Sequence, residues 1–167
     1  MSADFKYFPD VFKEVVDSAR LSNDPANNLL PYYAYGTYLE LLELCKIKDN
    51  NQIEKYPLVW LVWDNAENQQ KYIEPYLYNI TPRVFICSLT RTDFTSDEHY
   101  TNTLKAVLYP IFELVMSEMG YHANISLGAD FRYMVNDHPF WLNNDAGQLD
   151  VLSAIEIKFE NVLMIKS

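Results

Sequence analysis

The stretch Thr95–Gly120, TSDEHYTNTLKAVLYPIFELVMSEMG, predicts one long amphipathic helix around which the rest of the fold is arranged. Thr95 and Glu98 form the T-x-x-E pattern of a capping box, in which each side chain accepts a hydrogen bond from a backbone N–H of the first turn. Gly120 follows the apolar run and predicts a left-handed C-cap. Between these ends, apolar residues recur at helical spacing: Tyr100, Leu104, Val107, Leu108, Ile111, Leu114, Val115 and Met119.

Pro110 lies inside this predicted helix. A proline there removes one hydrogen bond and crowds the carbonyl of Ala106, so we expect a kink. The alternative is a pair of shorter helices that meet at Pro110.

Two apolar segments precede the helix and predict strands. Tyr56–Trp63, YPLVWLVW, is a continuous apolar run, which is typical of a central strand covered on both faces. Tyr76–Thr90 predicts a second strand region that contains Pro82. Because proline cannot donate to a strand ladder, Pro82 indicates an edge position or a bulge.

The remaining elements are shorter. Pro9–Leu21 predicts a first helix, and Tyr32–Tyr35 predicts a short strand closed by Gly36. Thr37–Cys45 predicts a helix that begins with a second T-x-x-E pattern. Ile125–Val135, interrupted at a glycine, predicts a strand, and Leu149–Ile165 alternates between apolar and charged residues, which predicts one buried face and one wet face.

This order of elements predicts an α+β fold. We expect a two-layer sandwich, with a mostly antiparallel sheet packed against one long kinked helix plus smaller N-terminal helices. The 167 residues are expected to form a single domain, with residues 1–50 as an N-terminal helical docking region and residues 55–165 as the α+β core.

Composition limits the possible functions. The net charge is −10, from 13 basic and 23 acidic residues, so DNA or RNA binding through a basic patch is not expected. The acidity fits either a negative wall along which DNA slides or ordinary solubility. Aromatic residues make up 15% of the chain, which fits either interface anchors or a tyrosine-rich fold without a special surface. We expect a soluble chain without a signal peptide, in which Cys45 and Cys87 are buried free thiols.

No catalytic, metal or cofactor motif is visible. His99, His122 and His138 lack the spacing of a zinc motif, and neither a G-x-S-x-G sequence nor a glycine-rich phosphate loop is present. An Asp137–His138 proton relay is disfavoured, because adjacent residues rarely face one another. A glycosidase carboxylate pair is neither excluded nor supported. We therefore expect a protein that is not an enzyme and holds no cofactor.

Several residues are expected at an interface because they lie in exposed loops or at a strand edge, or because they carry aromatic side chains. They are Asp64, Asn65, Glu67, Pro82, Phe94, His138, Phe140 and Trp141. The alternative for the aromatic segment 137–141 is a loop that folds back onto the core.

The segment YPLVWLVW, followed by RVFICSLTRTDFTSDEHYTNTLKAVLYPIFELV, resembles small virion proteins of tailed bacteriophages, especially those of crAss-like and related phages of gut bacteria. Such proteins are similar to the tail-terminator or tail-completion group. The resemblance covers roughly Lys55–Ile165 and rests on structural motifs, so no functional residue carries over. The plan that these proteins share is a strand pair, a short loop that opens on T-S-x-E, one long helix and closing strands. Residues 1–50 match no part of this plan.

The resemblance implies a homo-oligomeric ring, six- or twelve-fold, at the head–tail connector or tail. Its neighbours would be portal, connector or tail proteins, and DNA would pass through as cargo. The location implied is the virion neck or tail, with the host cytoplasm before assembly and no membrane. The competing hypothesis is a monomeric ligand-binding module or a small enzyme that uses the 137–141 aromatic loop.

Overall fold

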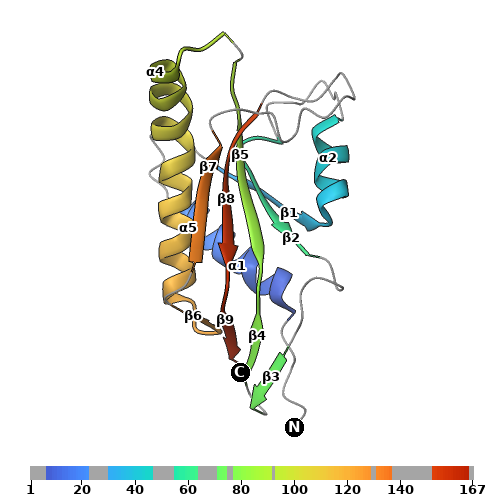
Figure 1. The fold of residues 1–167 in the computed structure, drawn as a ribbon. Helices are drawn as coiled ribbons and strands as arrows, with labels where there is room; N and C mark the ends of the chain where they lie inside the picture. Colours follow the sequence, from blue (N-terminus) through green and yellow to red (C-terminus); the bar gives the residue numbers. More distant parts are fainter. Residues whose placement is uncertain are drawn as a thin grey trace.

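The computed structural model describes residues 7–22, 30–46, 55–63, 71–74, 77–91, 93–128, 131–136 and 152–165 (Figure 1). Within these residues the chain has an α+β fold, in which one long helix packs against a mostly antiparallel sheet. The predicted fold class is therefore confirmed. The segments 64–70 and 137–141, which hold most of the predicted interface residues, lie outside the described residues.

The larger sheet has five strands in the order β1-β2-β5-β8-β7. β1 (Tyr32–Gly36) runs parallel to β2 (Leu58–Val62), and the other neighbours are antiparallel. The remaining strands of this sheet are β5 (Arg83–Leu89), β8 (Leu152–Phe159) and β7 (Phe131–Asn136). All five residues of β2 are buried, as expected of a strand covered on both faces.

The smaller sheet continues two strands of the larger one and has the order β3-β4-β9-β6 (Figure 1). Its strands are β3 (Lys71–Glu74), β4 (Leu77–Ile80), β9 (Val162–Ile165) and β6 (Ile125–Leu127). Pro82 is buried at the break between β4 and β5, where its carbonyl accepts a hydrogen bond from the Phe159 amide at 3.0 Å. Because β4 and β5 are both interior strands, the expectation of a sheet edge at Pro82 is wrong.

The long helix is continuous from Ser96 to Tyr121, in three segments: α4 (Ser96–His99), η1 (Tyr100–Leu108) and α5 (Tyr109–Tyr121). The capping box of Thr95 and Glu98 is confirmed, since each side chain accepts from the other residue's backbone N–H. η1 is π-helical, and the Tyr109 amide donates to the Leu104 carbonyl five residues back. The helix thus changes its hydrogen-bond pattern directly before Pro110, where the α-helical bond would be missing.

The end of the long helix differs from the expectation. Gly120 lies inside α5, and the capping residue is His122, whose backbone is extended with φ −71° and ψ 126°. The prediction of a left-handed C-cap at Gly120 is therefore wrong. The helix continues one residue past the glycine and ends where the chain turns into β6.

Two helices share one face of the sheet. α1 (Phe8–Ser22) packs beside α5, and both cover the inward-facing residues of β2, β5 and β8 (Figure 1). This core is built from apolar side chains, among them Phe8, Phe12, Val59, Leu61, Val84, Ile86, Leu108, Ile111, Ile155 and Ile157. Burial of such side chains, worth about 1.5–3 kcal/mol each, is the main stabilisation of the helix–sheet contact.

α2 (Tyr38–Lys46) covers part of the opposite face. Thr37 caps it, because the Thr37 amide donates to the Glu40 carboxylate at 2.6 Å and the Thr37 hydroxyl accepts from the Glu40 amide at 3.2 Å. Its Leu41 and Cys45 are buried in a second core with residues of β2, β5 and the start of β8. Residues 152–157 of β8 are all buried, so the solvent-exposed face predicted for this strand is confined to its second half.

Candidate interaction surface

Strand pairing aligns one residue from each strand of the larger sheet into rows. One row that faces the α2 side consists of Gly36, Val62, Arg83, Lys158 and Arg132. The next row on the same face consists of Ala34, Trp60, Phe85, Glu156 and Met134. Three cations therefore stand side by side on β5, β8 and β7, and we call Arg83, Lys158 and Arg132 the cation row.

Like charges directly opposite one another on neighbouring strands destabilise a sheet. Glu156, whose side chain is only 11% exposed, offsets part of this cost. One of its oxygens, Oε1, accepts from Arg83 Nε at 2.6 Å and lies 3.4 Å from Lys158 Nζ. Arg132 reaches a different carboxylate, with 3.1 Å between its Nε and Glu160 Oε1.

Aromatic rings hold Arg83 in place. Its guanidinium carbon lies 4.8 Å from the centre of the Phe85 ring and 5.6 Å from that of Tyr38, within the range of a cation–π contact. Burial raises the pKa of the Tyr38 hydroxyl above its ordinary value, although the charge of Arg83 opposes this shift. The Tyr38 ring therefore stays neutral at physiological pH and serves as packing for Arg83.

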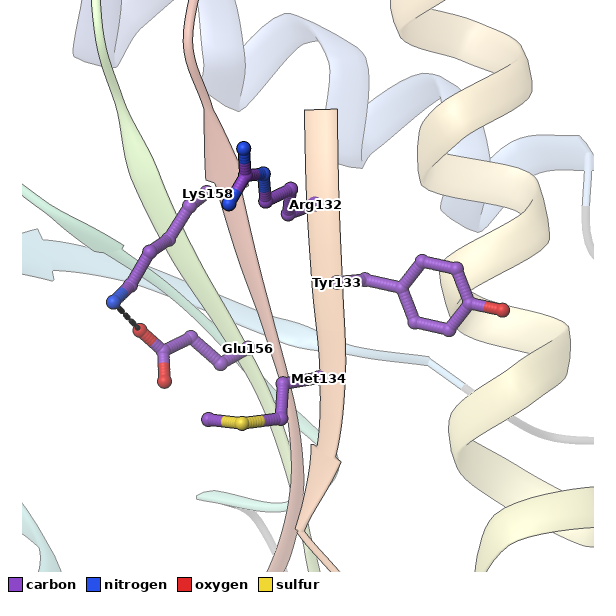
Figure 2. Close-up of a pocket in the computed structure, with 5 residues that line it drawn as sticks. All are labelled: Arg132, Tyr133, Met134, Glu156 and Lys158. Atoms are coloured by element: carbon purple, nitrogen blue, oxygen red, sulfur yellow. Dashed lines mark ion pairs between the residues drawn. The ribbon is translucent and has the colours of Figure 1, made fainter. Parts of the chain in front are cut away.

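A pocket of about 360 Å³ lies on the half of this face that α2 leaves open. In Figure 2, Arg132, Met134, Glu156 and Lys158 project to one side of the sheet, and Tyr133 projects to the other side, toward the long helix. The Arg132 and Lys158 side chains are 84% and 60% exposed. The pocket thus presents two accessible cations beside one largely enclosed carboxylate.

The same sheet has two unpaired borders within the described part of the chain. β1 pairs only with β2, and β7 pairs only with β8. Exposed aromatic side chains lie on both strands: Tyr32 and Tyr35 on β1, and Phe131 and Tyr133 on β7. Such borders carry unpaired backbone N–H and C=O groups that can pair with another strand.

Of the interface residues predicted from sequence, the structure describes Pro82 and Phe94, and it does not bring these two together. Pro82 and Phe94 flank opposite ends of β5, and Pro82 is buried. Phe94 is half-buried and packs edge-on against His99 at the start of the long helix, with ring centres 5.5 Å apart. The other predicted interface residues lie outside the described part of the chain: Asp64, Asn65, Glu67, His138, Phe140 and Trp141.

The cation row was missed by sequence reasoning. Arg132 and Lys158 belong to alternating strand patterns, which place them on a wet face. Their alignment with Arg83, however, depends on a pairing register between distant segments.

Two further findings concern the described residues alone. They contain no group of three or more His, Cys, Asp or Glu side chains arranged to hold a metal ion. No helix among them combines the length and the apolar character needed to cross a membrane.

No protein-family model matches this chain, and no curated protein matches it either. The fold and surface define an α+β protein whose larger sheet, in the described residues, offers two unlike free edges and a half-open cationic face.

Proposed function

We propose that this protein is a structural virion subunit of a tailed phage, which forms a homo-oligomeric ring at the head–tail connector or tail. The sequence resemblance supplies the virion setting, in which portal, connector or tail proteins are neighbours and DNA is only passing cargo. The observation that carries the ring is that β1 and β7, on opposite borders of one sheet, each have an edge that no described strand pairs with.

The strand directions suit head-to-tail pairing. β1 and β2 are parallel, whereas each later neighbour reverses direction, so β7 runs opposite to β1. If a copy is placed beside the first in the same orientation, its β1 lies antiparallel to β7 of the first. The contact joins two different surfaces, and repeated contacts of this kind close into a ring when the rotation between copies allows it.

The surface chemistry also supports assembly. Tyr and Phe side chains are the types that interfaces favour as anchors, and they are exposed on both border strands. The net charge of −10 suits a channel that DNA traverses without sticking.

The test is the mass of the purified protein by light scattering over a concentration series. We expect a closed species of six or twelve subunits. Tyr35→Lys, which places a charge on the β1 edge, should shift the protein to monomer, whereas Tyr121→Lys on the remote end of α5 should not. Circular dichroism checks that both variants are folded. A wild-type protein that remains monomeric up to roughly 1 mM, the concentration of very weak association, would overturn the proposal.

A monomeric ligand-binding module is the second candidate. The observation that favours it is the 360 Å³ pocket beside Arg132 and Lys158, which is of a size that holds a small anionic ligand. A strict monomer that binds small carboxylates or phosphates, and loses this binding in Arg132→Gln, would support the module over the ring.

A further inference from the structure

We propose that the cation row is the receiving site for α2 of the adjacent copy, whose exposed Leu39, Glu40 and Glu43 enter the open half of the sheet face. This inference rests on the proposed ring, because it needs a second copy at the β7 edge. It assigns a function to a surface whose charge is opposite to that of the protein as a whole.

α2 covers the face at β2, β5 and the start of β8, and the pocket lies at β7 and the second half of β8. When a copy adds β1 to β7 in the same orientation, its sheet continues the first sheet and its α2 lies on the same face as the pocket. The half of the sheet face that α2 leaves open in one copy then lies beside the half that α2 covers in the next copy.

Glu40 lies beside Gly36, since a Cβ atom built on Gly36 would come within 2.5 Å of Glu40 Oε2. Gly36 stands at one end of the row that contains the three cations, and Arg132 stands at the other end. If the rows continue across the border, Gly36 of the added copy pairs opposite Arg132, and adjacent strands are about 4.8 Å apart. This register brings the acidic side of α2 to the exposed end of the cation row.

Leu39 is 71% exposed and Met134 is 56% exposed, so each surface contributes an accessible apolar side chain. Glu40 and Glu43 are exposed on α2, and Arg132 and Lys158 are exposed at the pocket. Charge-assisted hydrogen bonds between Arg and carboxylate are among the stronger polar contacts. They also select orientation, because any arrangement that brings two acidic faces together is repelled.

The test is a charge exchange measured by sedimentation equilibrium on the full chain. Arg132→Glu alone and Glu43→Lys alone should each weaken association about tenfold or more, which corresponds to about 1.4 kcal/mol. The double variant, Arg132→Glu with Glu43→Lys, should return to within about threefold of the wild type, because the pair is restored with reversed polarity. Glu40 is left unchanged, since its carboxylate caps α2. Arg20→Glu, an exposed arginine of α1, is the matched control.

A second measurement tests the register. Ala34→Cys with Met134→Cys places two thiols in one continued row, and mild oxidation should link neighbouring copies into a ladder of covalent oligomers. The native thiols of Cys45 and Cys87 are buried, and oxidation of the wild-type protein gives the background level of cross-linking.

The outcomes are distinct. If the wild type assembles and Arg132→Glu assembles equally well, the α2 contact is wrong and the ring stands. If the wild type stays monomeric, the ring and the α2 contact fall together. If Arg132→Glu leaves assembly unchanged but abolishes binding of a short polyglutamate peptide, the cation row serves an acidic partner other than a second copy, and the proposal is overturned.

Discussion

Arg83 on β5 and Lys158 on β8 stand directly opposite each other, and both approach the same oxygen of Glu156, at 2.6 and 3.4 Å. Two cations at opposed positions repel one another, so the carboxylate between them stabilises the pair. Glu156 is 9% exposed, which means that water supplies little of this compensation. The side chain therefore matters for stability as well as for the charge of the surface.

Replacing Glu156 with Gln should lower the free energy of unfolding by about 1–3 kcal/mol, because Arg83 and Lys158 lose their shared negative partner in a mostly enclosed position. Urea denaturation gives the difference. The control is Glu160→Gln, which removes the exposed partner of Arg132 and should change stability by less than about 0.5 kcal/mol. Equal effects of the two substitutions would contradict the role assigned to Glu156.

The start of the long helix depends on Thr95. Thr95→Ala removes the hydroxyl that accepts from the Glu98 amide and should cost about 1 kcal/mol. Hydrogen exchange should show faster exchange of the first-turn amides. Thr101→Ala is the matched control, since Thr101 is exposed within the helix and alanine favours helix formation. A loss of stability in Thr101→Ala as large as that in Thr95→Ala would argue against capping.

Glu98 gives the same cap a pH dependence. Its carboxylate accepts from the Thr95 amide at 2.8 Å and from the Thr95 hydroxyl at 3.0 Å, and these hydrogen bonds lower the pKa of Glu98 below 4.5, its ordinary value. A lowered folded-state pKa stabilises the protein above the unfolded-state pKa, and this stabilisation is lost as pH falls through the folded-state value. The stability difference between wild type and Glu98→Gln should therefore be full at pH 7 and disappear in acid. Asp97→Asn changes the same turn but leaves the hydrogen bonds between Thr95 and Glu98 in place, so the pH dependence that comes from Glu98 should persist in this variant.

The capping boxes show what local sequence can predict. Thr95 with Glu98 and Thr37 with Glu40 depend on spacing within one turn, and both form as expected. β2 was also predictable, because a run of apolar residues has few alternatives to burial on both faces.

Features that depend on distant segments were not predictable. The cation row requires the pairing of β5 with β8 and of β8 with β7, and no local pattern sets those registers. Burial of Glu156 follows from its position beside Arg83 and near the second core. The alternating sequence pattern of the strand, taken alone, predicts that Glu156 is exposed to solvent, whereas it is buried.

Two single-residue predictions failed for a related reason. Pro82 was assigned to an edge or a bulge because it lacks a donor, but a break between two successive strands satisfies the same requirement. Gly120 was assigned to a left-handed cap, but α5 continues beyond it to Tyr121 and is capped by His122 with an extended backbone. In both cases the type of a single residue does not by itself specify the local structure.

The buried thiol of Cys87 predicts an alkaline limit to stability. Burial raises the pKa of Cys87 well above its ordinary value of 9.0, so the thiol stays protonated in the folded protein. When the folded-state pKa of a group is raised, its contribution to the free energy of unfolding is complete below the unfolded-state pKa. This contribution declines as pH rises above the unfolded-state pKa. We expect the free energy of unfolding to fall above about pH 8.5, and Cys87→Ala to reduce that decline.

Thiol reagents give an independent check on Cys87. Neither Cys45 nor Cys87 should react in the native protein at pH 8, and both should react once urea unfolds it. Rapid native-state labelling at Cys87 would show that the second core opens readily.

The salt dependence of association separates two electrostatic effects. Each copy carries a net charge of −10, so copies repel one another over long distances, whereas Arg132 and Lys158 are proposed to attract α2 at short range. The Debye length falls from about 30 Å at 0.01 M salt to about 8 Å at 0.15 M, which screens the long-range repulsion more than a contact of a few ångström. We therefore expect wild-type association to strengthen over this range. Arg132→Glu replaces an attraction with a repulsion and should be most impaired at 0.01 M salt, with the gap to the wild type narrowing as salt rises. Sedimentation equilibrium at three salt concentrations measures both trends, and wild-type association that weakens steadily with salt would contradict net repulsion as the opposing force.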